Sequence, residues 1–314
     1  MKKKLAVIAL GGNALLRGNE IGTIDEQEKN TFDTCKQLVD LIKKDFNIII
    51  THGNGPQVGN ILLRNEAGYD KYKIPQMPMD ICVADSQGGI GYMIERMMRN
   101  VLTEEKIKKN VVTLVTQVLV DKKDPAFENP TKPVGPFYIK EEADLLAKNN
   151  GWVFKKDPRN RGWRKVVASP IPIKIMNQDV IKSIANKGTI VIAVGGGGVP
   201  VYKHENGYLE AIEAVIDKDL ASSVLAKEIK ADRFYIVTDV PKVYINYNQK
   251  NQKELNNVKV AELEKYLAQD QFGAGSMGPK IRAAIKFAEA TGNESVITDT
   301  ATLKIPGCGT RITV

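Results

Sequence analysis

The sequence predicts an α/β protein with a mainly parallel central sheet, and two observations support this fold class. Short runs of apolar and β-branched residues alternate with longer stretches of helical periodicity, as expected when helices connect parallel strands. Three of the runs, Lys4–Leu10, Phe46–Thr51 and Thr189–Val194, lead directly into glycine-rich turns. Open parallel sheets bind their ligands at the carboxyl ends of strands, so we expect a binding site where these turns meet.

The composition is that of a globular chain. Its 314 residues are 43% apolar and 26% charged, which suffices for a sizeable core in one large α/β domain or in two lobes. No run approaches the ~18 apolar residues needed to span a bilayer. The apolar segment near the start is short and ends in Gly11-Gly12-Asn13, so it predicts a first buried strand rather than a signal peptide. We expect a cytoplasmic protein without membrane contact.

Cysteine and histidine are too sparse for several kinds of site. The three cysteines, Cys35, Cys82 and Cys308, are far apart and form no CxxC pair, which favours a reducing cytosol and argues against structural zinc. The only histidines are His52 and His204. A histidine-rich metal centre is therefore excluded, and we assign no metal ligand to the protein.

The net charge of +8 and the pI of about 9.1 indicate an anionic partner. The lysines are spread along the chain and interleaved with acids, so a small anionic substrate explains the sign as well as nucleic acid does. A basic cluster at 155–165 lies close to Trp152 and Trp163, and this alternation leaves nucleic-acid binding as an alternative. We expect no nucleic-acid partner.

The first part of the chain predicts strand, helix, strand, helix and strand in that order. The second helix contains Gly88, Gly89 and Gly91, each of which costs about 1 kcal/mol relative to alanine. We therefore expect these glycines to serve close packing, at a helix crossing or a subunit interface. The five elements are Lys4–Leu10, Asp25–Lys44, Phe46–Thr51, 79–105 and Val111–Val120.

The segment Asp121–Val166 differs in composition from the rest of the chain and predicts a projecting insertion. It is rich in proline and holds both tryptophans and the basic cluster. We expect a helix at Ile139–Asn149 and a hairpin at Trp152–Val166. Pro130–Pro136 predicts a rigid loop, and its one cation, Lys132, could reach over a site; a plain surface loop explains the prolines equally well.

The remaining part again alternates helices and strands. Four glycines, Gly195–Gly198, follow a strand, and Asp217-Lys218-Asp219 places a cation between two carboxylates at a helix start. A third glycine-rich turn leads to Lys280, with Pro279 expected at the first helical position. The elements are helix Ile175–Lys187, strand Thr189–Val194, strand Arg233–Thr238, helix Val260–Gln269, helix Lys280–Ala290, and strands Ser295–Thr298 and Thr310–Val314.

These turns match none of the common glycine motifs. The chain has no G-x-x-x-x-G-K-[ST] loop and no clean G-x-G-x-x-G, and Gly275-Ser276-Met277-Gly278 is not a nucleophile elbow. What remains is many backbone N–H donors, isolated lysines such as Lys218 and Lys280, and few groups for proton transfer. This inventory suits phosphoryl transfer, in which positioning and charge stabilisation dominate.

The strings that carry most information are Ala9–Ala14, Thr51–Gly59, Asp80 with Asp85–Tyr92, Pro130–Pro136, Gly195–Val201, Ala214–Asp219, Thr238–Val240 and Gly275–Lys280. The GGNA, GNGPQVG and SQGGIGY sequences within them are together highly specific. Over essentially its whole length the chain resembles the carbamate kinases of the amino acid kinase superfamily.

The resemblance implies a three-layer αβα sandwich with about eight strands and a small projecting subdomain at about 121–166. It implies one domain over 1–314, with an N-terminal lobe of about 1–190 for the carbamoyl group and a C-terminal lobe of about 191–314 for the nucleotide. The family's reaction is ATP + carbamate ⇌ ADP + carbamoyl phosphate with Mg²⁺ bound mainly through the nucleotide phosphates. The family forms homodimers and commonly serves arginine or related catabolism.

Site residues follow from the resemblance position by position. Lys218 and Lys280 would neutralise charge on the moving phosphoryl group, Asp219 would organise them, and Lys132 would close over the substrate. The substrate cradle would be Gly11, Gly12, Asn13, Gly53, Asn54 and Gly55. The nucleotide would contact Gly195, Gly196, Thr238, Asp239, Tyr244, Gly275, Met277 and Gly278.

One departure from the family pattern is Pro241, where an acidic residue is expected after Thr238-Asp239-Val240. It lies near the expected adenine contacts. An N-acetylglutamate-kinase-like or aspartokinase-like enzyme that acts on a larger carboxylate is the enzymatic alternative. The residues do not fix the direction in which the reaction runs.

Overall fold

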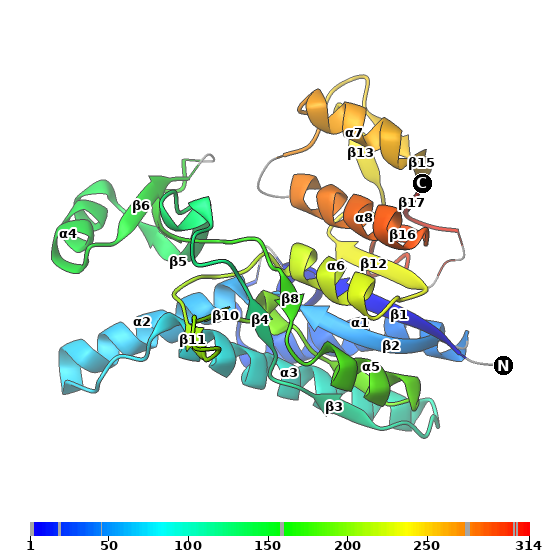
Figure 1. The fold of residues 1–314 in the computed structure, drawn as a ribbon, viewed down its shortest axis with the longest axis horizontal. Helices are drawn as coiled ribbons and strands as arrows, with labels where there is room; N and C mark the ends of the chain where they lie inside the picture. The colour runs from blue at the N-terminus through cyan, green and yellow to red at the C-terminus, as the bar shows by residue number, and fades with distance from the viewer. Residues whose placement is uncertain are drawn as a thin grey trace.

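The computed structural model describes residues 3–17, 20–44, 46–157, 160–273, 277–303, 305 and 307–314, with Asn13 described in its backbone only. Within these ranges an eight-stranded sheet forms the centre of the molecule (Figure 1). Across the sheet the strands are β15 (Asn257–Lys259), β17 (Thr310–Thr313), β16 (Ser295–Asp299), β12 (Arg233–Thr238), β1 (Lys4–Leu10), β2 (Phe46–His52), β9 (Ile190–Ile192) and β3 (Val111–Thr113). The six strands from β16 to β3 run parallel. Strand β17 is antiparallel to β16, and β15 pairs parallel with β17.

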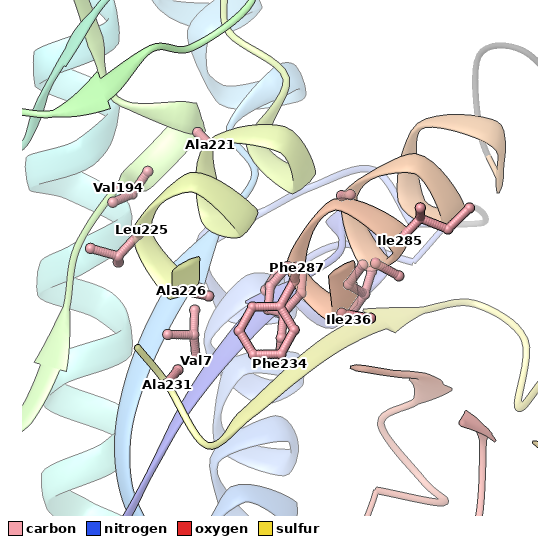
Figure 2. Close-up of a cluster of buried hydrophobic side chains, with 14 of the residues drawn as sticks. Val7, Val194, Ala221, Leu225, Ala226, Ala231, Phe234, Ile236, Ile285 and Phe287 are labelled. Carbon is pink, nitrogen blue, oxygen red and sulfur yellow. The ribbon is translucent and has the colours of Figure 1, made fainter. Parts of the chain in front are cut away.

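Helices cover both faces of this sheet and complete the predicted three-layer αβα sandwich. Successive residues of a strand point to opposite faces, so Val7 of β1 packs in one core and Ile8 in the other. Figure 2 shows part of the first core, where the rings of Phe234 and Phe287 lie 5.5 Å apart and Val7 lies near Ala226 and Ala231. Helices α1 (Ile24–Lys43) and α3 (Met79–Glu104) cover the second core, and α5 (Gln178–Asn186), α6 (Lys218–Glu228), α7 (Val260–Ala268) and α8 (Met277–Thr291) contribute to the first.

The glycines of α3 divide into two kinds. Gly91 is buried, and a Cβ there would come 2.2 Å from the Cγ2 of Thr113, so this glycine permits the helix to lie close to β3. Gly88 and Gly89 are exposed, and a Cβ on either would meet nothing. Close packing is thus confirmed for Gly91, while the subunit-interface prediction stays open for the other two.

A small subdomain projects from the main body, as predicted (Figure 1). It consists of a three-stranded sheet, β5 (Lys132–Tyr138), β7 (Trp163–Val167) and β6 (Val153–Lys156), with helix α4 (Lys140–Asn150). It contacts α2 (Gly55–Tyr72), where a Cβ on Gly59 would lie 2.8 Å from the backbone of Gly135. Two backbones therefore meet with no side chain between them.

Two predictions about this region need correction. The segment from Lys132 is strand β5 and not a rigid loop, because an edge strand tolerates prolines whose missing N–H needs no partner. The predicted strand Val111–Val120 is two strands, β3 and β4 (Gln117–Leu119), which belong to different sheets. The break lies at Thr116, whose backbone N–H and carbonyl are both hydrogen-bonded by the side chain of Gln87.

Other boundaries also differ from expectation. Lys174–Ile175 forms strand β8 beside β4, so the helix expected from Ile175 begins at Gln178. Helix α8 begins at Met277, which makes Pro279 its third residue rather than its first. Helix α2 was not predicted, nor were the short strands β10 (Val199–Lys203), β11 (Leu209–Ala211), β13 (Val243–Ile245), β14 (Lys253–Leu255) and β15.

The sheet is continuous across the expected lobe boundary near residue 190, which falls inside β9, so the division into two functional lobes stays a prediction. None of the helices in the described ranges combines the length and the apolar character of a membrane span.

Candidate active site

Two lysines, Lys218 and Lys280, and one aspartate, Asp219, form the charged centre of the site, which we call the lysine centre. Lys218 and Asp219 open helix α6, and Lys280 lies in the first turns of the neighbouring α8 (Figure 1). The Nζ of Lys218 donates to Asp219 Oδ1 at 2.5 Å, and the Nζ of Lys280 donates to Asp219 Oδ2 at 2.9 Å. One carboxylate therefore uses both oxygens to hold two ammonium groups, as the resemblance implies.

Burial and charge act against each other in this group. Asp219 is 3% exposed, and burial alone raises the pKa of its carboxyl, but the two lysines lower that pKa to about 2. Burial, aided by the charge of Lys280, lowers the pKa of Lys218, and Asp219 opposes this change. For Lys280 burial also lowers the pKa, but Asp219 outweighs it and the net pKa is raised. Asp219 thus keeps the lysines charged in a partly dehydrated place.

Asp217 links the projecting subdomain to this centre. As N-cap of α6, its Oδ1 accepts from the backbone N–H of Asp219 at 3.0 Å and of Leu220 at 3.2 Å. Its Oδ2 accepts from the Nζ of Lys132 at 3.2 Å. The three predicted lysines therefore meet two carboxylates, Asp217 and Asp219, at the start of one helix. Asp217 was not assigned a role from sequence, although its position before Lys218-Asp219 was the available signal.

The glycine turns after β1 and β2 lie beside the lysine centre. A Cβ on Gly11 would come 2.7 Å from the carbonyl of Val237, so only glycine permits this approach to β12. A Cβ on Gly53 would lie 3.7 Å from the Cδ of Lys218. Gly12 faces open space, and Gly55 opens helix α2, with Asn54 before it. Asn13 lies in the short 3₁₀ turn that follows β1. The role of these residues as a substrate cradle stays a prediction.

Gly195 and Gly196 occupy a different place from the expected nucleotide contacts. A Cβ on Gly195 would lie 2.5 Å from the Nε2 of His52, and one on Gly196, where φ is +63°, would lie 2.2 Å from the Nδ2 of Asn54. The glycine run therefore packs against the second glycine turn. Its contact with nucleotide stays a prediction.

A cavity of about 380 Å³ collects most of the other predicted nucleotide residues. Thr238, Asp239, Tyr244, Met277 and Lys280 all line it. Gly278 is buried beside it, with its N–H bonded to Gly273 O, while Gly275 lies outside the described residues. The other lining residues are Val240, Tyr247, Asn248, Gln271, Phe272 and Gly273.

Two aromatic rings distinguish this cavity. The rings of Tyr244 and Tyr247 lie 5.9 Å apart with their planes tilted by 44°, and both line the wall, which gives aromatic faces on which a base could stack. Tyr247 was missed because nothing in its local sequence separates it from a surface tyrosine. Pro241 is not among the described residues that line the cavity.

His52 is buried beside the lysine centre without a charge of its own. Burial lowers the pKa of His52 to about 4. The hydrogen bond to Gly53 opposes this change, and the charge of Lys218 adds to it. Its Nδ1 lies 3.0 Å from the carbonyl of Gly53, which can only accept, so Nδ1 carries the proton. The residue therefore orients the turn and is not a proton donor for the reaction.

This predicts a pH dependence of stability. Because the pKa of His52 is lower in the folded state than in the unfolded chain, the unfolded chain binds the proton first, and stability is lost as pH falls below the unfolded value of about 6.5. Between pH 7 and 5 the loss should reach about 2 kcal/mol. Urea unfolding of wild type, His52→Asn and the control His204→Gln measures it. His52→Asn should lose this slope and His204→Gln should keep it; equal slopes in all three would contradict the assignment.

Comparison with known proteins agrees with the geometry. The family model described as "Amino acid kinase family" matches residues 4–299. The chain is 52% identical to a carbamate kinase of Pyrococcus horikoshii over 291 residues, which cover 93% of this chain and 92% of that protein. It is 50% identical to a carbamate kinase of Pyrococcus furiosus, with 94% and 93% covered.

A solved structure, that of carbamate kinase from Giardia lamblia bound to AMP-PNP, superposes with a TM-score of 0.91 at 45% identity and covers 99% of this chain and 98% of that one. Matches of this extent include the glycine turns, the lysine centre and the projecting subdomain together. The chain therefore belongs to the amino acid kinase family and, within it, to the carbamate kinases.

Proposed function

We propose that this kinase transfers a phosphoryl group reversibly between carbamoyl phosphate and ADP and gives ATP and carbamate. The observation that carries the proposal is the position of Lys280, which lines the tyrosine-walled cavity and also bonds to Asp219. One cation thus connects a cavity suited to a nucleotide with the glycine turns suited to a small phosphate. The AMP-PNP bound by the relative from Giardia lamblia supports a nucleotide as one substrate.

The proposed mechanism needs charge and position rather than proton transfer. Lys218, beside Gly53, and Lys280, at the cavity, would stabilise the negative charge on the phosphoryl oxygens during in-line transfer. Asp219 would hold both ammonium groups at the right spacing before substrate arrives. Carbamate leaves as an anion, so no general base is required, and this agrees with a neutral His52 that is turned toward a backbone carbonyl.

We propose that Mg²⁺ enters with the nucleotide. The described residues contain no group of three or more His, Cys, Asp or Glu side chains placed to hold a metal. Both oxygens of Asp219 already serve lysines. A magnesium ion that keeps several waters and binds through the nucleotide phosphates fits this donor set.

A homodimer is proposed from the exposed face of α3. Ile81 and Tyr92 are exposed, and between them Gly88 and Gly89 leave open space that another backbone could approach. Sedimentation of wild type and Gly88→Trp would test this.

We further propose a cytoplasmic location and a role in arginine or related catabolism with net ATP formation.

A coupled assay of ATP formation from carbamoyl phosphate and MgADP tests the proposed reaction. We expect turnover with carbamoyl phosphate and none with aspartyl or N-acetylglutamyl phosphate. Turnover with the larger acyl phosphates instead would favour the alternative enzymes.

The basic cluster does not require a nucleic acid. The Nζ of Lys165 lies 3.4 Å from the ring centre of Trp152. The Cζ atoms of Arg161 and Arg164 lie 4.5 and 5.2 Å from the ring centre of Phe137. These cations stack inside the subdomain, which supports the small-substrate interpretation.

Replacing Lys132 by alanine should raise KM for carbamoyl phosphate and lower kcat while ADP affinity stays almost unchanged. Its ammonium reaches the start of α6 from the subdomain, on the side of the glycine turns and outside the tyrosine-walled cavity. ADP calorimetry and steady-state kinetics measure the two effects. Lys155→Ala, an exposed lysine of the same subdomain, is the control. Loss of ADP binding with an unaltered KM for carbamoyl phosphate would assign the subdomain to the nucleotide.

A further inference from the structure

A second cavity, of about 370 Å³, lies between the projecting subdomain and the main body. One wall is the first turn of α2, Gly55 to Gln57, and the opposite wall is β5 with Arg161 and Arg164. Among the described residues that line it, two are arginines and none is acidic. The charge of Arg161 is met by Asp157, which does not line the cavity, whereas Arg164 forms no ion pair with a carboxylate of the described chain. The complete lining is Leu16, Ile21, Gly22, Gln27, Gly55, Pro56, Gln57, Asn60, Pro133, Gly135, Pro136, Phe137, Arg161 and Arg164.

The two arginines differ in their partners. Arg161 is paired with Asp157, with Nε 3.0 Å from Oδ2 and NH2 3.1 Å from Oδ1. Arg164 donates one hydrogen bond, from NH2 to the carbonyl of Gly135 at 2.8 Å, and like Arg161 it lies over the ring of Phe137. Its Nε is buried without a hydrogen-bond partner, and no carboxylate of the described chain lies within ion-pair distance of it.

The guanidinium of Arg164 therefore keeps a buried N–H donor that has no hydrogen-bond partner. Burial, together with the charge of Arg161, lowers the pKa of Arg164, and the charge of Asp157 only partly opposes this change. An arginine stays charged in proteins, so the free-energy cost of burying its charge is offset either by contacts within the protein or by a bound anion. Facing it, the first-turn amides of α2 have no helical carbonyl to bond, and the side chain of Asn54 does not cap them.

The position of the cavity suggests where its ligand goes. Gly55 belongs both to this cavity and to the expected substrate cradle, and Pro133 is the neighbour of Lys132. An anion held here would lie next to the lysine centre without occupying it.

From this arrangement we infer that the cavity is an anion-binding subsite, with Arg164 as its principal ligand and the start of α2 as the opposite wall. The ligand is a small oxyanion that carries a carboxylate, carbamate or phosphate group. A guanidinium offers two parallel N–H donors to such a group, and peptide amides at a helix start add further donors. The assignment of the ligand as an approaching substrate rests on the proposed function, whereas the anion site itself does not.

Inorganic phosphate is the probe, and tryptophan fluorescence is the readout, because the chain's only tryptophans, Trp152 and Trp163, both lie in the subdomain. Titrations at constant ionic strength use a Lys280→Ala background, which weakens phosphate binding at the lysine centre. In that background Arg164→Gln should weaken phosphate binding about tenfold or more, and Arg164→Lys should lie between it and the parent. Lys156→Gln removes one charge from an exposed position of the same subdomain outside the cavity and should have little effect.

Equal phosphate affinity in Arg164→Gln and Lys156→Gln, or no saturable binding in the background protein, would overturn the inference. If Arg164→Gln does not fold, the comparison between Arg164→Lys and Lys156→Gln decides. In the otherwise unaltered enzyme, a raised KM for carbamoyl phosphate with an unchanged KM for ADP would identify the anion as the entering substrate. Weaker phosphate binding with both KM values unchanged would identify a separate inorganic anion, and either result supports the subsite. Absence of turnover with carbamoyl phosphate would remove the proposed reaction and leave the phosphate titration to test the cavity alone.

Discussion

Asp219→Asn is expected to lower kcat by at least ~10² although the side chain keeps its shape. The carboxylate now serves two ammonium groups, 2.5 and 2.9 Å away, and both are largely buried. An amide removes the negative charge and turns one acceptor into a donor that faces a lysine. The two cations would then repel each other across the phosphate site, and burial would lower the pKa of Lys218 further.

The pH profile separates this explanation from simple loss of structure. If the lysines of the variant lose their protons more easily, the alkaline limb of its kcat profile should move to lower pH. Asp179→Asn, also in the first turn of a helix but exposed, is the control and should retain wild-type kcat. A kcat for Asp219→Asn within about threefold of wild type would show that the carboxylate does not organise the lysines.

Lys280→Ala should lower kcat by at least ~10² and leave the fold intact, and Lys218→Ala should have a comparable effect. In the proposed mechanism each lysine stabilises charge in the transition state, and neither side chain belongs to a hydrophobic core. Because Lys280 lines the tyrosine-walled cavity, its loss should also weaken ADP binding; Lys218 lies beside Gly53, so its loss should act on carbamoyl phosphate.

Both lysines share Asp219, so their effects should not add. The loss in the double variant should differ from the sum of the two single losses, in free energy, by more than measurement error. Lys286→Ala removes an exposed lysine from the same helix as Lys280 and is the matched control. Near-wild-type turnover of Lys280→Ala with an unchanged melting temperature would exclude Lys280 from the site.

The sequence predicted the central sheet well because its signals are local. The strands at Lys4–Leu10 and Arg233–Thr238 are continuous apolar runs, since both faces of the sheet are covered by helices. Asp217, Lys218 and Asp219 could be placed at a helix start because an N-cap is readable within a few residues. The convergence of Asp219 and Lys280 came from the resemblance, since no local pattern joins positions 61 residues apart.

What could not be predicted depends on contacts between distant segments. The strand at Val111–Val120 breaks because Gln87 binds the backbone of Thr116, and no pattern near Thr116 reveals this. Strand β5 forms because β7 supplies a partner for a segment whose prolines suggest a loop. Gly195 and Gly196 make room for His52 and Asn54, a packing contact that the glycine run itself does not reveal, and their contact with nucleotide stays a prediction.

In the proposed reaction, Asp217 competes with the substrate for the ammonium group of Lys132. In the present arrangement Lys132 is already neutralised at 3.2 Å by the residue that caps α6. An arriving anion must exchange with that carboxylate, so substrate affinity reflects the difference between two ion pairs rather than the strength of one. Asp217 keeps its cap through Oδ1 when Oδ2 is released, so the exchange leaves the helix that carries Lys218 and Asp219 in place.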